Sequence, residues 1–551
     1  MKKNVICLFI ALLPLLLLNL TGCNSNVTKN KSVSSYLNTK SEFPIVDQKI
    51  ELSITVLKRA NSGSVDKIWF WKFIQEKTNI KFNITQIDDS ALMEKKNLMF
   101  AVNELPDILY GLGLRTTDIV KYGVVNKQLA ELSELIENNA PDIKSAFEQY
   151  PTAKQSVKAY DGKIYSLPYI AGDPKNSFSY YRSWINKKWL DNLKLPMPTN
   201  LDELYTVLKA FKEKDPNGNG KADEIPLGGT WRDLSPAPII LASLGFITDP
   251  TAYYSLSPAI RNGKAVIPAG DPAYKEYLTY MNKLYSEGLL DRDIFVNSTT
   301  AFSSKASEDR VGIHMATPFT ISPNKWRDFD SLPPLVSNFN AEKMWAGPIK
   351  EEPGAFAISE KCKYKEAAIR FANYFFTMEG SLYTWFGPQK GTTDTLGVVG
   401  GWDASDTGEI KYDYPQGVSN TYDYILGYIA PMDGNRVGIG RECIGVENRI
   451  GKYPTYPAGA QEWRNLTKKN MAPYYKPIYP KVYFPLDVQE KLDSLSTSLI
   501  DYIGQHEAKF ITGDEPLSNF DDFVKRLEVL GIREVETIYN DAYQSYLKSL
   551  K

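Results

Sequence analysis

The chain is poor in histidine and cysteine, and this restricts the chemistry that it can support. Its 551 residues include four Cys and only two His, His314 and His506. Two histidines cannot form a histidine-rich zinc site, and no HExxH motif is present. The GxSxG, GxxxxGK[ST] and GxGxxG motifs, which mark many hydrolases and nucleotide-binding proteins, are absent as well. The sequence therefore nominates no catalytic machinery.

An excess of charge of either sign is also missing. The 64 basic and 65 acidic residues give a net charge of −1. Removal of residues 1–22 takes away Lys2 and Lys3 but no acidic residue, which leaves 62 basic and 65 acidic residues and a net charge of −3. This balance provides no basic surface for nucleic acid and no polybasic membrane patch. A chain of this length exceeds what one hydrophobic core usually supports, so two or three lobes are expected.

The first residues form a targeting segment. Lys2-Lys3 precede an apolar run over residues 5–18, which is typical of a secretory signal peptide and is shorter than the ~20 residues that cross a bilayer. Leu20-Thr-Gly-Cys23 resembles the bacterial lipoprotein box, which implies cleavage after residue 22 and lipidation of Cys23. Two or more acyl chains, such as palmitate, hold a protein stably on a membrane. The alternative is a secreted protein in which this Cys carries no lipid.

The residues that follow the signal are polar. Residues 23–48 are rich in Asn, Ser, Thr and Lys and have no helical or strand periodicity, so they predict a flexible tether. Cys7 leaves with the signal and Cys23 is the predicted anchor. Cys362 and Cys443 could pair, but nothing in their spacing demands it. We expect a protein on the extracytoplasmic face of the cell membrane.

Strands and helices alternate from residue 50 onward. Their patterns predict strands over 50–56, 80–84 and 105–110 and helices over about 65–78 and 90–102. Strands separated by helices predict a mainly parallel sheet, which binds ligands beyond the carboxyl ends of its strands. The loops after Val56 and Tyr110 should therefore face a crevice, and Arg59 and Arg115 become candidate ligand residues, with a solvated surface position as the alternative for each.

The most specific motif is an EF-hand-like loop, Asp215-Pro-Asn-Gly-Asn-Gly-Lys-Ala-Asp-Glu-Ile-Pro226. Oxygen-bearing side chains at positions 1, 3, 5 and 9 and Gly at position 6 copy the first part of a calcium loop. Pro226 stands where the bidentate Glu belongs, so Glu224 would have to complete the ligand shell. The alternative is a turn without metal. The predicted ligands of a structural Ca²⁺ are Asp215, Asn217, Asn219, the carbonyl of Lys221, Asp223 and Glu224.

Several segments resemble the bacterial extracellular solute-binding proteins of family 1, which serve carbohydrate uptake. Asp161-Gly-Lys-Ile-Tyr-Ser-Leu-Pro168 is similar to the family's DGKxYxLP segment, and Leu105-Pro-Asp-Ile-Leu-Tyr110 to one of its strands. Residues 508–546, which begin Ala508-Lys-Phe-Ile-Thr-Gly513, resemble its C-terminal helices. The calcium loop is similar to that of alginate-oligosaccharide binders, in which it braces a lobe. The resemblance covers about residues 50–550.

This resemblance implies an α/β fold of the periplasmic-binding-protein type, with two α/β lobes joined by a three-segment hinge. Met344-Trp-Ala-Gly-Pro-Ile349 and Ser381-Leu-Tyr-Thr-Trp-Phe-Gly387 are similar to the family's second and third crossings. The implied N-lobe comprises residues 49–170 and 346–385, and the implied C-lobe comprises residues 171–345 and 386–551.

The implied function is that of a lipid-anchored, monomeric substrate-binding subunit of an ABC importer. It would capture an oligosaccharide in the interlobe cleft and deliver it to the permease subunits, without enzymatic activity and without binding nucleic acid. Aromatic rings stack on the apolar faces of sugars, and polar groups bond their hydroxyls. The predicted ligand residues are Trp231, Trp345, Trp385, Tyr181 and Arg59.

Two alternatives remain open from the sequence. A surface lipoprotein that degrades glycans would need paired carboxylates across a cleft, and no motif nominates such a pair. A receptor of the same architecture could instead bind a peptide or a lipid. The calcium loop and the C-terminal segment favour the carbohydrate group.

Overall fold

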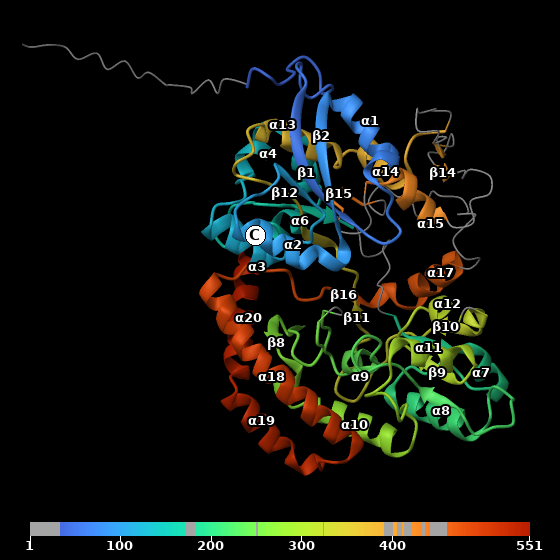
Figure 1. Ribbon diagram of the computed structural model, residues 1–551. Coiled ribbons are helices and arrows are strands. Elements are labelled where there is room, and N and C mark those ends of the chain that lie inside the picture. Colours follow the sequence, from blue (N-terminus) through green and yellow to red (C-terminus); the bar gives the residue numbers. More distant parts are fainter. Residues whose placement is uncertain are drawn as a thin grey trace, which may run out of the picture.

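Two main β-sheets, each with its own hydrophobic core, divide the chain into an N-lobe and a C-lobe. The N-lobe lies above the C-lobe in Figure 1. The computed structural model describes residues 34–171, 182–249, 252–322, 324–390, 401–404, 410–412, 421–431, 436–440 and 460–550. The α/β, two-lobed architecture confirms the predicted fold class, whereas the three-segment hinge stays a prediction.

The N-lobe sheet has six strands in the order β15-β4-β12-β3-β1-β2. β1 pairs in parallel with β2 and β3, as the alternation of strands and helices predicts. β12, which brings the chain back from the C-lobe, is antiparallel to both of its neighbours, so the sheet is mixed. The strands are β1 (Ile50–Lys58), β2 (Ile80–Asp88), β3 (Ile108–Tyr110), β4 (Leu167–Ile170), β12 (Glu351–Ile358) and β15 (Gly438–Ile439).

Helices and short turns cover this sheet. The predicted helices over 65–78 and 90–102 are present as a 3₁₀ turn (Val65–Lys67) followed by α1, and as α2. The helices are α1 (Trp69–Thr78), α2 (Leu92–Ala101), α3 (Thr116–Ile119), α4 (Ser133–Asn139), α5 (Pro141–Gln149), α6 (Pro151–Ser156), α13 (Lys365–Tyr374), α14 (Met378–Phe386) and α15 (Thr421–Tyr424). Two π-helical turns, η3 (Val120–Val125) and η6 (Ile425–Ile429), and a small hairpin of β13 (Trp402–Ala404) and β14 (Ile410–Tyr412) complete the lobe.

Two predicted boundaries differ from the structure. Residues 34–48 do not form a free tether, because Leu37, Ile45 and Val46 are buried in the N-lobe core. The hydroxyl of Ser34 donates to Glu366 at 3.0 Å, which ties this segment to α13. The N-lobe also extends beyond residue 385, since β15 is an edge strand of its sheet and Val437 packs in its core. The hydrophobic pattern of the sequence did not predict the return of the chain to the N-lobe, because β15 is too short to show periodicity.

The C-lobe is built on a four-stranded sheet in the order β10-β5-β9-β6, in which β6 and β9 are parallel. Its strands are β5 (Trp184–Asn186), β6 (Ile225–Leu227), β9 (Val311–His314) and β10 (Phe329–Ser331), and β7 (Ala259–Arg261) and β8 (Lys264–Val266) form a separate hairpin. Its helices are α7 (Lys187–Leu193), α8 (Leu201–Glu213), α9 (Ala237–Ser243), α10 (Tyr274–Ser286), α11 (Thr299–Ser307), α12 (Pro318–Ile321), α17 (Ala460–Asn470), α18 (Leu486–Thr512), α19 (Phe520–Val529) and α20 (Ile532–Ser549).

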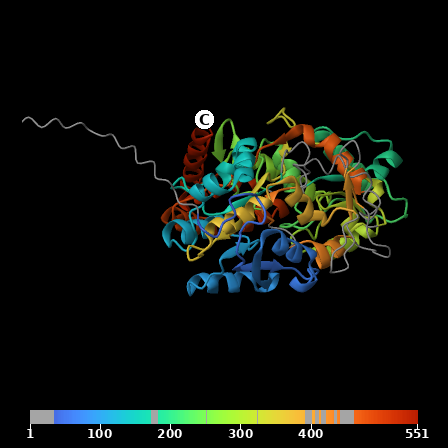
Figure 2. The ribbon, with the colours of Figure 1, turned by 90° about the horizontal axis from the view of Figure 1, so that it is seen from above.

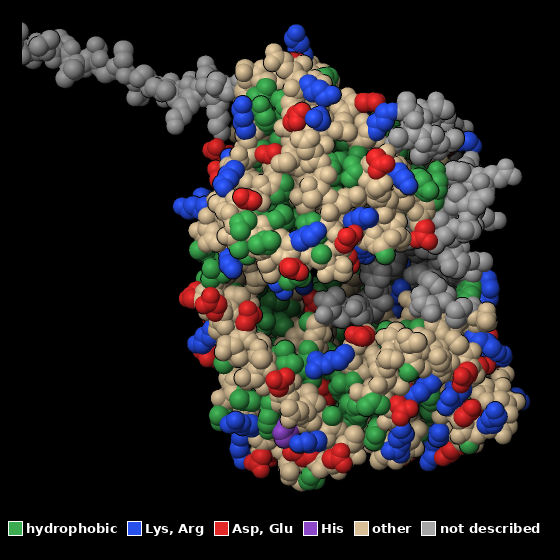
Figure 3. All heavy atoms as spheres, in the orientation of Figure 1, with side chains coloured by type: hydrophobic (Ala, Val, Ile, Leu, Met, Phe, Trp, Pro, Cys, Tyr) green, Lys and Arg blue, Asp and Glu red, His purple; other side chains and the backbone are tan. Residues whose placement is uncertain are grey.

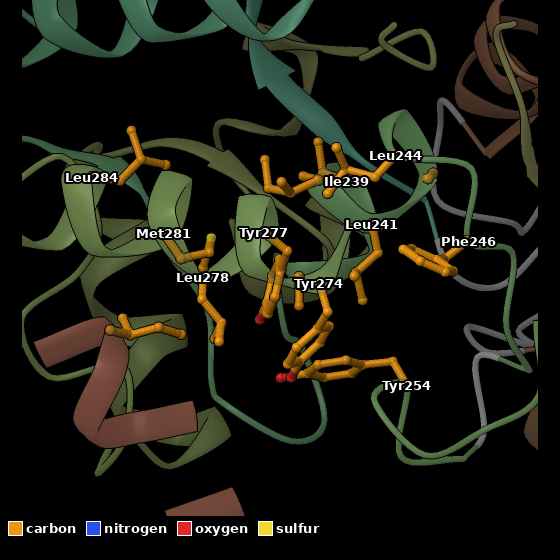
Figure 4. Packing of buried hydrophobic residues seen from close by; sticks show 14 of the residues in the cluster. Ile239, Leu241, Leu244, Phe246, Tyr254, Tyr274, Tyr277, Leu278, Met281 and Leu284 are labelled. Atoms are coloured by element: carbon orange, nitrogen blue, oxygen red, sulfur yellow. The ribbon is translucent and has the colours of Figure 1, made fainter. Parts of the chain in front are cut away.

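Periodic apolar side chains account for the C-lobe core. Leu204, Leu208 and Phe211 recur at helical spacing on α8 and are buried, and the Asn200 side chain caps this helix by accepting the Glu203 amide at 2.9 Å. Figure 4 shows apolar side chains of α9 and α10 packed together in the same core. The C-terminal helices α18, α19 and α20 contribute further buried residues to this core.

One segment contacts both lobes. β16 (Tyr475–Lys476) pairs in parallel with β11 (Trp345–Ala346), where the chain crosses between the lobes. Farther along, Tyr483 packs in an N-lobe cluster, whereas Phe484 packs against the C-lobe core. The end of α20 also lies close to the N-lobe helices (Figures 1 and 2). None of the helices within the described ranges is long and apolar enough to cross a membrane.

Candidate ligand-binding site

The carboxyl ends of β1 and β3 meet at one edge of the N-lobe sheet, because these strands are parallel with Val56 opposite Tyr110. Arg59 follows β1 directly and is half-buried at this edge. In the same loop, the amide of Gly63 donates to the carbonyl of Leu426, on η6, at 3.0 Å. A Cβ at Gly63 would lie 2.0 Å from the Gly427 carbonyl oxygen, so only glycine allows this approach. The loop that carries Arg59 is therefore seated on η6.

Trp385 lies in the last turn of α14 and is half-buried. The guanidinium of Arg436 lies 3.5 Å from the centre of the Trp385 ring, and Arg436 is only 4% exposed. The Arg436 Nη1 also donates to the Thr384 carbonyl at 3.2 Å. Burial raises the pKa of the Tyr110 hydroxyl, and the positive charge of Arg436 opposes that rise. Arg436 therefore links Trp385 to the end of β3.

The end of α14 is fixed by further contacts. The indole Nε1 of Trp402 donates to the Gly387 carbonyl at 2.7 Å, and Trp402 is 8% exposed. The side chain of Asn61, in the loop after β1, donates to the carboxylate of Asp423 at 3.2 Å. Asp423 lies on α15, which directly precedes η6 in the sequence. The structure thus brings the Arg59 loop and η6 together at the crevice edge, where Trp385 lies against Arg436 and the charge of Arg436 acts on Tyr110. These groups offer an aromatic ring, cations, amides and backbone groups, which is the chemistry that binds polyhydroxylated ligands.

The other predicted aromatic residues have different surroundings. Trp345 is 3% exposed and belongs to the C-lobe core. Trp231 follows β6 in the C-lobe, is 8% exposed and packs 4.4 Å from Phe295 between ring centres. The indole nitrogen of Trp231 is buried and has no hydrogen-bond partner within the described part of the chain. Tyr181 lies outside the described residues. Ligand contact by these three residues, as by Trp385 and Arg59, stays a prediction.

Part of the boundary between the lobes, on the left in Figure 3, is hollowed on the face shown. A separate hollow of about 630 Å³ lies on the N-lobe between α2 and η3. Its lining includes Phe100, Lys121 and Tyr122 but none of the predicted ligand residues. The crevice edge, rather than this surface hollow, therefore holds the predicted residues Arg59 and Trp385.

The EF-hand-like loop is wound as its spacing predicts. The carboxylate of Asp215 accepts the amides of Asn219 and Gly220 at 3.1 and 3.0 Å, and the Asn219 side chain accepts the Lys221 amide at 2.7 Å. The Asn217 side chain accepts the Asn219 amide at 3.0 Å. These bonds turn the oxygens of positions 1, 3 and 5 toward the inside of the loop.

The other two predicted side-chain ligands, Asp223 and Glu224, are held differently. Asp223 accepts from the Asn219 side chain at 3.1 Å and forms an ion pair with Arg310 at 3.5 Å. Glu224 is 2% exposed, and its Oε1 is buried without a hydrogen-bond partner among the described residues. Burial, followed by the nearby charges of Asp223 and Asp215, raises the pKa of Glu224. The hard oxygen donors and the unsatisfied buried carboxylate fit a calcium ion. Within the described ranges, however, no three His, Cys, Asp or Glu side chains gather closely enough to hold a metal.

Sequence reasoning missed Arg436, Tyr110 and η6. Arg436 stands in a stretch without periodicity or motif, and its contact with Trp385 joins residues that are 51 positions apart. For Tyr110 the sequence contained only an indirect indication: it ends a predicted strand, and the loop after it was expected to face the crevice.

The two-lobed α/β fold, with polar and aromatic groups at the carboxyl edge of a sheet, defines a solute-binding protein of the periplasmic type. Residues 60–381 match the family model described as bacterial extracellular solute-binding protein, and the chain belongs to this family. As a member of it, the protein binds a solute and is not an enzyme.

Three curated relatives are similar to the chain. The fructooligosaccharide ABC transporter substrate-binding protein FusA of Streptococcus pneumoniae serotype 4 is 26% identical over 520 residues, which cover 92% of each chain. Lipoprotein LipO of Bacillus subtilis is 27% identical over 55% of each chain. The polygalacturonan/rhamnogalacturonan-binding protein YtcQ of Bacillus subtilis is 28% identical over 60% of this chain and 63% of the relative.

Solved structures share the fold. A solute-binding protein of Bifidobacterium longum infantis, described as HMO-binding and ABC-transporter-associated, superposes with a TM-score of 0.77 at 22% identity, over 91% of this chain and 99% of that one. An EF-hand mutant of S. pneumoniae FusA in complex with fructo-nystose gives a TM-score of 0.69 at 22% identity, over 90% of this chain and 99% of that one. The alginate-binding protein AlgQ2 without calcium ion gives 0.63 at 23% identity, over 91% and 99%.

Proposed function

We propose that this protein is the substrate-binding subunit of an ABC importer and captures an oligosaccharide between its lobes. The observation that carries the proposal is the similarity to FusA, which extends over 92% of both chains and therefore includes both lobes. The names of FusA and YtcQ both specify saccharides built from several units. The family membership supplies the extracytoplasmic solute-binding role, and these relatives support its carbohydrate character.

The crevice edge of the N-lobe would supply one half of the binding site. The half-buried Trp385 would stack on the apolar face of a sugar, while Arg59 and Asn61 lie in the loop that would bond its hydroxyls. The C-lobe would contribute the other half, with Trp231 near the carboxyl end of β6 as a candidate. A ligand that touches both lobes only when they are closed would shift the protein toward the closed state.

A sugar panel tests the proposal directly. Kestose, nystose, a galacturonate trisaccharide and an alginate trisaccharide would be compared by thermal shift and then by titration calorimetry. A ligand that binds only the folded state raises the melting temperature by mass action. We expect at least one of these sugars to bind with a stoichiometry near one and to be recovered uncleaved. Absence of binding across this panel and a wider set of oligosaccharides would contradict the proposal, and cleavage products would favour a glycan-degrading enzyme.

We expect Trp385→Ala to weaken the affinity for the bound sugar at least tenfold, because the ring would be the stacking surface of the N-lobe. One aromatic stack contributes about 1 kcal/mol beyond the area that it buries, and truncation also loses that burial. Tyr205→Ala is the matched control, since Tyr205 lies on α8 of the C-lobe and bonds Glu287 at 2.7 Å. Equal calorimetric affinities of the Trp385→Ala and wild-type proteins would remove Trp385 from the site. Trp231→Ala and Trp345→Ala would be measured alongside.

We also propose that the loop from Asp215 to Glu224 binds a structural calcium ion. The inward oxygens of Asp215, Asn217 and Asn219 support this proposal, as does the unsatisfied carboxylate oxygen of Glu224. Asp223 and the Lys221 carbonyl would complete the set. A bound cation would offset the cost of burying Glu224 and would brace the loop between α8 and β6.

Removal of calcium is expected to lower the melting temperature of the C-lobe by several degrees, because an ion that binds only the folded loop stabilises it. Melting would be followed in 1 mM CaCl₂ and in 1 mM EGTA for the wild type, for Asp215→Asn and for Asp522→Asn, a surface control on α19. The wild type and the control should respond to the chelator, and Asp215→Asn should not. Identical wild-type melting curves, with no calcium in the purified protein by mass spectrometry, would leave the loop as a turn.

The membrane location is the last part of the proposal. Leu20-Thr-Gly-Cys23 supports lipidation of Cys23, and one relative is named a lipoprotein. Residues 23–33 would then link the lipid to Ser34, which is tied to α13. In this arrangement the lipid anchor would be attached through the N-lobe, and the protein would deliver its ligand to permease subunits as a monomer.

A further inference from the structure

We infer that Arg436 is the positioning residue of the sugar-stacking platform and holds the Trp385 ring in its binding orientation. This inference rests on the proposed carbohydrate-binding function. It assigns a role to a side chain that lies far from Trp385 in the sequence and that no motif marks.

The first observation is the contact itself. The guanidinium carbon of Arg436 lies 3.5 Å from the centre of the Trp385 ring, which places the planar cation against one ring face. At 4% exposure the guanidinium is shielded from water, and a cation–π contact is strongest when it is desolvated. Arg is suited to this role because its planar group can stack, whereas the ammonium of Lys is a compact point charge.

The second observation is that Arg436 is bonded to the same helix that carries the ring. Its Nη1 donates to the carbonyl of Thr384, the residue before Trp385. This carbonyl belongs to the last turn of α14, where the helix dipole favours a positive charge. One side chain therefore contacts both the backbone and the ring of the α14 terminus, which restricts the two side-chain torsions of Trp385.

The third observation is that the backbone on which Arg436 stands is itself fixed. Two residues later, Gly438 begins β15, which pairs with β4. Gly438 has φ 98°, and a Cβ at this position would lie 2.2 Å from the Phe375 carbonyl oxygen, so the backbone is held against the segment that precedes α14. The hydroxyl of Ser381, on α14, donates to the Ile439 carbonyl at 2.6 Å. The backbone of Arg436 is thus fixed by the sheet. Because Arg436 contacts the Trp385 ring, the sheet also fixes the orientation of that ring.

These contacts have a consequence for binding. Because the guanidinium covers one face of Trp385, a sugar can stack only on the ring's other exposed surface. A ring that is already held in place loses less conformational entropy when a ligand stacks on it. Arg436 should therefore contribute to affinity without touching the ligand, and it should do so through the order of the Trp385 ring.

The test combines a ligand-independent signal with affinity. Protein labelled with 5-fluorotryptophan would be studied by ¹⁹F NMR, with the Trp385 resonance assigned by its absence in Trp385→Phe. Arg436→Met, Arg436→Lys and the control Arg370→Met would be compared; Arg370 likewise donates to a backbone carbonyl, that of Asn38, at 2.7 Å. Titration calorimetry would use kestose and the other three sugars of the panel.

In Arg436→Met we expect the Trp385 resonance to shift and broaden and the sugar affinity to fall at least tenfold. Arg436→Lys should give an intermediate loss, and Arg370→Met should leave both readouts at the wild-type values. A Trp385 resonance that is unchanged in Arg436→Met would overturn the inference, as would an unchanged affinity. If the wild type binds no sugar, the proposed function fails, while the fluorine resonance still decides whether Arg436 positions the ring. Should Arg436→Met fail to fold, Arg436→Lys decides the same question.

Discussion

Replacement of Lys96 by Met is expected to lower the free energy of unfolding of the N-lobe by about 3–5 kcal/mol, the usual cost of removing one partner of a buried ion pair. The Lys96 side chain, on α2, is 1% exposed, and its ammonium lies 2.8 Å from the carboxylate of Asp118, whose side chain is 10% exposed. Met fills a similar volume and cannot pair with the carboxylate. The loss therefore reports the cost of leaving the Asp118 carboxylate charged with only the exposed guanidinium of Arg115, 3.9 Å away, as a counter-ion.

This ion pair also shapes the crevice edge. Asp118 accepts the Arg115 amide at 3.0 Å at the start of α3, and Lys96 reaches the Gly113 carbonyl at 3.4 Å. Both contacts fix residues 111–115, the loop that follows β3. Loss of the pair should therefore loosen the loop next to Tyr110 as well as destabilise the lobe.

Urea unfolding followed by circular dichroism would measure the effect, with the two lobes fitted as separate transitions where they do not coincide. Lys95→Met is the matched control, because Lys95 is the exposed neighbour on the same helix. The double variant Lys96→Met/Asp118→Leu should recover much of the lost stability, since no buried charge then remains unpaired. If Lys96→Met costs no more than Lys95→Met, the pair is not the stabilising contact that its burial indicates.

Elements with strong local signals were predictable from the sequence. The alternation at residues 50–56, the helical spacing of Leu204, Leu208 and Phe211, and the cap at Asn200 each follow from contacts within a few residues. The calcium loop was recognisable for the same reason, because its ligands are spaced within ten residues. The family resemblance then ordered these elements into two lobes, which the fold and the family model confirm.

Contacts between distant residues could not be read in this way. β12 is antiparallel to its neighbours because the chain enters it on returning from the C-lobe. No local sequence pattern indicates the direction in which a strand runs. The burial of Leu37 and Val46 depends on the surface of α13, so a polar composition alone suggested a free tether. Among the site residues, Trp385 and Arg59 were named from their places near a crossing and a strand end. Arg436 was missed because its place is set by β15, a strand of two residues.

The second large effect that we expect concerns acid stability, and it arises from His314. This residue is fully buried at the end of β9, with its ring 4.7 Å from Phe329 and 6.3 Å from Phe302 between centres. Burial lowers the pKa of His314 to about 3, and an interaction with the Ala316 backbone opposes this shift. In the unfolded chain the pKa of a histidine is about 6.5.

The sign of the effect follows from proton binding. Below about pH 6.5 the unfolded chain takes up a proton at His314 while the folded protein does not, so acid favours unfolding until the pH reaches about 3. Stability is therefore fully present above pH 6.5 and declines below it. With these two pKa values the wild type should lose about 3 kcal/mol through this residue between pH 7 and pH 4.

Unfolding by urea at pH 7, 6, 5 and 4 would separate this contribution from those of the carboxylates, which titrate in every variant. His314→Leu removes the titrating ring and keeps an apolar side chain in the core, so its free energy of unfolding should fall less steeply with acid than that of the wild type. His506→Gln is the control, because His506 is the chain's other histidine and lies half-buried on α18 beside Glu515. Parallel pH profiles for His314→Leu and the wild type would show that His314 either takes up its proton in the folded state or is not enclosed by the C-lobe.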